Sequence, residues 1–362
     1  MSTSEKEVPV FGKLNNNVNL CFHLAYNSRH FGANYGQQYH SDPVYRVETD
    51  MKVAKGLYQQ FGKYGMGSVD PKPSPGVGIQ PLDFMNGAMG GKMVYKENTS
   101  VETPDKPLSV IKTIEDVQNL VDIDWETSLL LQNCFEQAEK IQQAYPDSSI
   151  CEIQSVWQEG ADGQESFLTM HTPYTTAFRL FGQEILEKMM LEEDFAEAIF
   201  EWLMRQYRSL WDTICKKRGW KGNKIHFGDC AATMLSPKIY ERMCLPLYQR
   251  LMENFEHCVI HSCGPSSHLL ELFAQVPKVR QLQLGHGTDL AKARKLFPDS
   301  YILAYYEPWR LLSESPGEIE KELWKMTEQL EDKFNIGCGG ADPDTPQENV
   351  YTFLETAEKI KS

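Results

Sequence analysis

A histidine and a cysteine stand two residues apart in the stretch VIHSCG, residues 259–264. The apolar residues before them are typical of a buried strand, and in a strand residues i and i+2 point to the same side. We therefore expect His261 and Cys263 to face one site together. Imidazole and thiolate are both ligands that zinc prefers. The pair alone is a weak signal, because a buried cysteine is often only a small core residue.

A second cysteine strengthens the zinc interpretation. Cys338 follows another short apolar run, in FNIGCGG at residues 334–340. One imidazole and two thiolates form a ligand set suited to zinc, and three protein ligands leave a fourth position open, as catalytic zinc sites do. A thiol bound at that position would be held as thiolate, a strong nucleophile at neutral pH.

The elements that must position these residues alternate regularly. In the second half, amphipathic helices separate the apolar runs KIHFGD, HCVIHSCG, VRQLQLGHG, SYILAYYEP and FNIGCGG, a pattern typical of a parallel sheet. Further strands are expected at residues 18–23, at 65–70 and near Cys151, which gives about eight. We predict an α/β fold, a (β/α)8 TIM barrel, over residues 18–362, with an N-terminal arm at 1–17 and loop or hairpin insertions. An open doubly wound sheet is the alternative, but no G-x-G-x-x-G follows the first strand.

The third barrel strand stays open, and two aspartates mark the starts of helices. Either of two runs between residues 149 and 171 could be the third barrel strand; the second would bring His171 to the mouth. Asp42-Pro43 predicts the start of a helix, and Asp289 is suited to cap another through its side chain.

Polar residues at the predicted strand ends are candidates for chemistry, because barrel enzymes react at the carboxyl ends of their strands. Asp229, His286 and Glu307 are candidate catalytic groups, although Asp229 could instead cap a loop and His286 could support a ligand. Tyr305 and Tyr306 are candidate substrate-binding residues, since tyrosine faces attract cationic methyl donors. His23, at the end of the first strand, and Arg29, in the loop after it, are two more.

Composition excludes several classes. The 362 residues include 36 Lys and Arg against 50 Asp and Glu, a net charge of −14, which disfavours nucleic-acid and anionic-membrane partners. Nine cysteines without paired spacing indicate reduced thiols in the cytoplasm rather than a disulfide framework. We expect neither a signal peptide nor a membrane span.

Three stretches carry a family resemblance. IHFGDCAATMLSPKIYERMCLPLYQRL, VIHSCGPSSHLLELF and NIGCGGADPDTPQENVYTFLETA resemble the uroporphyrinogen decarboxylase superfamily, and most closely its zinc-dependent methyltransferase branch. The resemblance implies zinc held by His261, Cys263 and Cys338. It also implies methyl transfer between a corrinoid and a thiol or small methylated substrate. The corrinoid would sit on a partner protein, because this chain has no D-x-H-x-x-G signature; a homodimer is also possible.

The sequence departs from the superfamily in ways that keep alternatives open. Decarboxylases carry an arginine-rich loop after the first strand, where this chain has only Arg29, and the G-D-D motif is here Gly228-Asp229-Cys230. The alternatives are a decarboxylase without metal and a non-catalytic binding barrel. The fourth zinc ligand is also open, with water or one of four side chains as candidates: Asp229, Glu152, Glu159 and Glu307.

Overall fold

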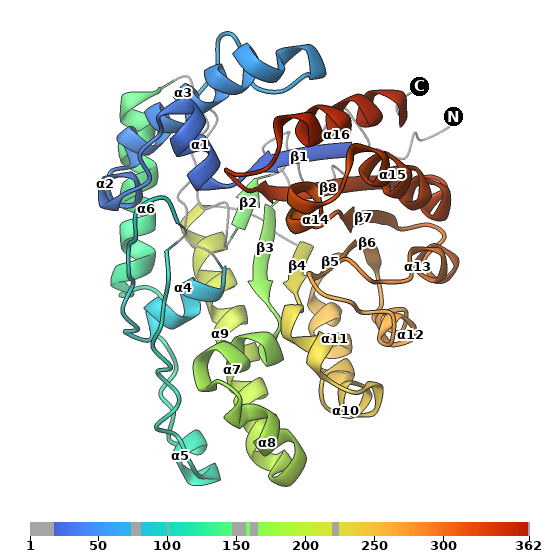
Figure 1. The fold of residues 1–362 in the computed structure, drawn as a ribbon. Helices are drawn as coiled ribbons and strands as arrows, with labels where there is room; N and C mark the ends of the chain where they lie inside the picture. Colours follow the sequence, from blue (N-terminus) through green and yellow to red (C-terminus); the bar gives the residue numbers. More distant parts are fainter. Residues whose placement is uncertain are drawn as a thin grey trace, which may run out of the picture.

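A computed structural model describes residues 18–73, 81–99, 101–146, 157–159, 166–218 and 224–360. One eight-stranded sheet curls through the centre, with helices around its outside (Figure 1). The strands are β1 Val18–Phe22, β2 Trp157–Glu159, β3 Ser166–His171, β4 Lys224–Gly228, β5 His257–Ser262, β6 Val279–Leu284, β7 Tyr301–Tyr305 and β8 Phe334–Ala341. The α-helices are α1 Leu24–Phe31, α2 Gln37–Ser41, α3 Pro43–Phe61, α4 Pro81–Ala88, α5 Ile114–Gln118, α6 Leu129–Ala144, α7 Pro173–Phe181, α8 Glu184–Leu191, α9 Glu193–Arg218, α10 Pro237–Met243, α11 Leu245–Leu251, α12 Leu270–Phe273, α13 Leu290–Leu296, α14 Pro308–Ser313, α15 Pro316–Leu330 and α16 Gln347–Ile360.

The strand order is β1-β8-β7-β6-β5-β4-β3-β2. All neighbours pair in parallel except β2, which is antiparallel to β3. Seven parallel strands with helical connections make the predicted TIM-barrel type of α/β fold. The carboxyl ends of β4 and β5 lie side by side, since Gly228 pairs with His261.

The sheet has an apolar outer face and a polar inner face. Ile225, Ile260 and Ile302 are at most 2% exposed and belong to the core that the helices cover. Residues one position along each strand point the opposite way, and there β4 and β5 carry His226 and His261. Burial of each large apolar side chain contributes about 1.5–3 kcal/mol to the stability of the fold. The outer face therefore stabilises the barrel, and the inner face is available for chemistry.

The open question of the third strand is answered by pairing. β3 joins β4 in parallel, whereas the earlier run contributes only the short antiparallel β2; Cys151 lies outside the described residues. His171 therefore ends a barrel strand. The arm at residues 1–17 also lies outside the described residues.

One predicted strand is wrong. Residues 65–70 form turns after a 3₁₀ helix, Gly62–Tyr64, and Gly65 and Gly67 both have positive φ. A Cβ on Gly67 would meet the backbone of Ala54 and Tyr58 in α3 at less than 3.0 Å. This segment therefore crosses α3 at close range, which requires glycine, and it does not join the sheet.

The predicted helix starts are confirmed. The Asp42 carboxylate accepts hydrogen bonds from the backbone N–H groups of Val44 and Tyr45 at the start of α3. Asp289 caps α13 by accepting from the Lys292 N–H at 2.9 Å. Such caps satisfy N–H groups that have no partner inside the helix. In the part of the chain that is described, no helix is both long and apolar enough to cross a membrane.

Candidate metal centre

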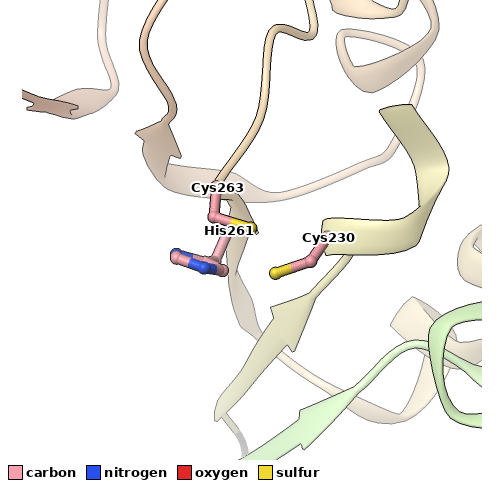
Figure 2. A group of neighbouring side chains, drawn as sticks. All are labelled: Cys230, His261 and Cys263. Carbon is pink, nitrogen blue, oxygen red and sulfur yellow. The ribbon is translucent and has the colours of Figure 1, made fainter. Parts of the chain in front are cut away.

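Cys230, His261 and Cys263 come together at the carboxyl end of the barrel (Figure 2). Each offers one ligand atom, and the three atoms lie within 4.8 Å of one another. His261 is the second-to-last residue of β5, Cys263 follows that strand, and Cys230 begins the 3₁₀ helix after β4. Among the histidine, cysteine and acidic side chains of the described residues, this is the group whose ligand atoms lie close enough together to hold a metal ion.

The donor set fits a zinc ion. One imidazole and two sulfur atoms are ligands that zinc prefers, and three protein ligands leave a coordination position open. The thiols are already unequal. The contact with Cys230, and then the one with His261, lowers the pKa of Cys263, while the contact between the two thiols raises the pKa of Cys230. Cys263 is thus the thiol that more readily becomes the thiolate a metal requires.

Cys230 was not among the predicted ligands. The signal that could have revealed it is its position directly after a barrel strand, where the superfamily motif carries a second aspartate. Strand pairing of β4 with β5 brings the residue after Asp229 next to the H-x-C pair.

Cys338 is placed elsewhere. It is 1% exposed and belongs to the apolar core. It lies two residues after Ile336 and therefore on the same face of β8. Ile336 pairs with the buried Ala304 of β7. Burial raises the pKa of its thiol, as do Cys21 and Glu307 nearby. Cys338 does not join the group of three, and its role as a zinc ligand stays a prediction.

Asp229 is enclosed rather than open to the barrel mouth. Its carboxylate is 1% exposed. It accepts hydrogen bonds from four hydroxyl groups, those of Thr172 at 2.7 Å, Tyr240 at 3.0 Å, Tyr248 at 3.1 Å and Thr175 at 3.4 Å. Its backbone N–H also donates to the His261 carbonyl at 2.6 Å. This arrangement indicates that Asp229 fixes the loop carrying Cys230; a catalytic role stays a prediction.

The buried carboxylate predicts a pH effect on stability. Burial raises the pKa of Asp229 to about 6, although the hydroxyl contacts partly oppose this. The folded protein therefore holds this proton more tightly than the unfolded chain, whose pKa is near 3.9. The contribution of Asp229 to stability is fully present below pH 4 and is lost as pH rises through 6. Compared with Asp229→Asn, wild type should lose about 3 kcal/mol of unfolding free energy over this range.

Urea unfolding of both proteins at pH 4, 5, 6 and 7 measures the difference. Asparagine keeps one oxygen for the hydroxyl groups and removes the titration. A difference in unfolding free energy that does not change with pH would show that Asp229 does not titrate in this range.

The two tyrosines predicted to bind substrate at the end of the seventh strand lie on opposite faces of the sheet. Tyr305 lies at the site, with its ring centroid 5.6 Å from that of His261. Tyr306 is instead 1% exposed; its hydroxyl donates to Glu314 at 2.8 Å and its ring packs edge-on against Phe353. Substrate binding by Tyr306 has no support from this position.

His286 and Glu307 do not belong to the group of three. His286 is half-buried, 3.5 Å from the Arg310 guanidinium and edge-on to the Trp309 ring. Glu307 precedes α14 and lies close enough to Cys338 to affect its pKa. Their catalytic roles stay predictions.

The residues at the first strand end have structural partners. His23 caps α1, accepting the Ala25 N–H at its Nδ1. Arg29 forms an exposed ion pair of 2.5 Å with Asp344 and donates to the Pro343 carbonyl, so it ties α1 to the loop after β8. Of the candidate fourth ligands, Asp229 and Glu307 lie outside the group of three; Glu152 and the side chain of Glu159 lie outside the described part of the protein.

Two further histidines line the inner face. His226 lies on β4, which pairs with β5, and His171 lies on β3, one strand further along the sheet. Burial, and then the neighbouring histidines, lower the pKa of each to about 3. Both are therefore neutral at physiological pH and add polar groups, but no charge of their own, to the barrel interior.

Comparisons with known proteins agree with this architecture. The family profile described as Uroporphyrinogen decarboxylase (URO-D) matches residues 84–360, more than half of the chain. The chain belongs to this family. A search of curated proteins found no match.

A solved methyltransferase structure has the same fold. A methyltransferase from Methanosarcina mazei superimposes with a TM-score of 0.59 at 16% identity, covering 96% of this chain and 95% of that one. A B12-independent methionine synthase from Shewanella sp. W3-18-1, in complex with selenomethionine, matches with a TM-score of 0.39 at 11% identity, covering 75% of this chain and 74% of that chain.

Proposed function

We propose that this protein is a zinc-dependent methyltransferase that moves a methyl group between a corrinoid on a partner protein and a thiol or small methylated substrate. The observation that carries the proposal is the group of Cys230, His261 and Cys263 at the carboxyl end of the barrel. Membership of the URO-D family and the fold shared with the Methanosarcina methyltransferase support it.

The three side chains would hold zinc and leave a position for the thiol. When bound, zinc stabilises a coordinated thiol as the thiolate, which is the nucleophile needed for methyl transfer. Cys263, whose pKa is already lowered by its neighbours, would be the first sulfur ligand. Cys338 is a further candidate ligand, which would require its side chain to leave the core.

The chain's other residues set the surroundings of the thiol. Tyr305, His171 and His226 present neutral polar groups. These groups can contact the zinc-bound thiol without adding a charge of their own. We also propose that the protein is cytoplasmic, where its thiols stay reduced.

Decarboxylation without metal is the weaker candidate. A substrate with several carboxylates requires cationic side chains at the mouth. Arg29, the arginine expected there, is paired with Asp344, and His171 and His226 are neutral. A non-catalytic barrel is the remaining alternative.

The test measures metal first and methyl transfer second. We expect about one zinc per chain in purified protein, and Co–CH₃ formation, followed by absorbance, when free cob(I)alamin and a panel of methylated substrates are supplied. Chelator-treated protein is the control and should lose the activity until zinc is returned. A zinc-free preparation with full activity would overturn the metal mechanism. Zinc binding without methyl transfer across the panel would favour a binding barrel.

A further inference from the structure

Gln283 links the metal centre to the rest of the barrel interior. It lies on β6, is 6% exposed and pairs across strands with His261. Its Oε1 atom is 2.9 Å from His261 Nδ1, 3.2 Å from the Tyr305 hydroxyl and 3.3 Å from His226 Nε2. One amide oxygen thus contacts three side chains around the site.

The chemistry of these contacts fixes the protons. An amide oxygen only accepts hydrogen bonds, so each ring nitrogen that bonds to it must carry a proton. His261 is then protonated at Nδ1, and neutral His226 is protonated at Nε2. The Tyr305 hydroxyl donates to the same oxygen, which leaves its own oxygen to face His261 Nδ1 at 3.3 Å. Every contact in this group is consistent with one set of proton positions.

We propose that Gln283 is a positioning residue that holds His261 in the Nδ1–H tautomer and in a fixed ring orientation. The Nε2 lone pair is thereby reserved for the metal. Metal-binding histidines depend on such a partner, whose loss typically costs 10–100-fold in metal affinity. This inference rests on the proposed zinc site.

The choice of an amide has a consequence for charge. Zinc with two thiolates and a neutral imidazole has no net charge, and a neutral partner leaves it so. A carboxylate at position 283 would add a negative charge beside the sulfur atoms and make the His261 imidazole a stronger donor. Gln283 therefore fixes the orientation of His261 without adding charge where the substrate thiol would bind.

Two substitutions at position 283 separate positioning from simple packing. Gln283→Leu keeps the approximate volume but removes the acceptor; Gln283→Glu keeps the acceptor. Gln281→Leu is the matched control, because Gln281 is also buried on β6, on the same face, and its Nε2 atom has no hydrogen-bond partner in the part of the chain that is described.

Zinc affinity is measured by competition with a chelator, and thermal unfolding of the metal-free proteins is measured alongside it. We expect Gln283→Leu to weaken zinc binding 10–100-fold. Gln283→Glu should bind zinc at least as tightly as wild type, and Gln281→Leu should bind within threefold. Equal losses in Gln283→Leu and Gln283→Glu, or in Gln283→Leu and Gln281→Leu, would overturn the inference.

A second readout reports the histidine itself. In ¹⁵N-labelled wild type, the His261 resonances should show a proton on Nδ1, and Gln283→Leu should shift them toward a tautomer mixture. An unchanged resonance in Gln283→Leu would contradict the proposal. If wild type binds no zinc, the proposed function fails; if wild type binds zinc and Gln283→Leu binds it equally well, only this inference fails.

Discussion

His261→Ala and Cys263→Ser are each expected to weaken zinc binding about 100-fold or more, so that zinc is lost to a competing chelator, and methyl transfer with it. Zinc bound by structural sites is worth about 10–16 kcal/mol in apparent free energy, so losing one of three protein ligands should cost about 3 kcal/mol or more, roughly 100-fold in affinity. Neither side chain is in the core: His261 is half-buried and Cys263 is exposed. The unfolding temperature of the metal-free protein should therefore change little.

Zinc per chain after dialysis against a weak chelator, together with thermal unfolding, measures this result. Cys258→Ser is a poor control because Cys258 is buried in the core. Cys215→Ser is better, since Cys215 is a half-buried cysteine on α9, away from the site. Retention of one tightly bound zinc in both His261→Ala and Cys263→Ser would contradict the assignment.

The same assay decides between the two candidates for the second sulfur ligand. If the geometry of the group of three persists when zinc binds, Cys230→Ser should lower zinc affinity about 100-fold and Cys338→Ser much less. The opposite order would mean that metal binding draws Cys338 out of the core. Comparable losses in both variants would indicate that both sulfur atoms coordinate the ion.

The part of the site carried by one strand could be predicted from the sequence. His261 and Cys263 are two residues apart, and the alternation of a strand puts them on one side whatever the rest of the fold does. Cys230 could not be found in this way. Its approach depends on the register of β4 against β5 and on the turn after Asp229, which is set by four hydroxyl groups from α7, α10 and α11.

In the fold, too, local patterns could be predicted from the sequence and contacts between distant elements could not. Regular alternation in the second half predicted β4 to β8 because each strand is short, apolar and preceded by an amphipathic helix. Residues 65–70 contain only two large apolar side chains and cross α3 at close range, and no local pattern reveals that contact. The face of β8 occupied by Cys338 likewise depends on where the strand begins, because a shift of one residue reverses every side chain.

Gly285→Ala is expected to disrupt both the barrel and the metal centre. A Cβ at this position would lie less than 3.0 Å from the backbone carbonyl of Cys263 and from the N atom of Gly264. Backbone atoms cannot move away as the end of a flexible side chain can, and the Gly285 N–H is held by the Ser262 carbonyl at 2.7 Å. The loop carrying Cys263 must therefore shift, at a cost of about 3 kcal/mol in stability.

Zinc affinity should fall with stability in this variant, because a displacement of Cys263 separates its sulfur from His261 and Cys230. Gly339→Ala is the matched control: Gly339 lies on β8, and a Cβ there would meet nothing within 4 Å. Urea unfolding and chelator competition on both variants measure the two effects. The interpretation requires that Gly285→Ala lose stability and zinc affinity together while Gly339→Ala keeps both. A stable Gly285→Ala variant with wild-type zinc affinity would show that the loop after β5 tolerates displacement and that Cys263 is not held by this contact.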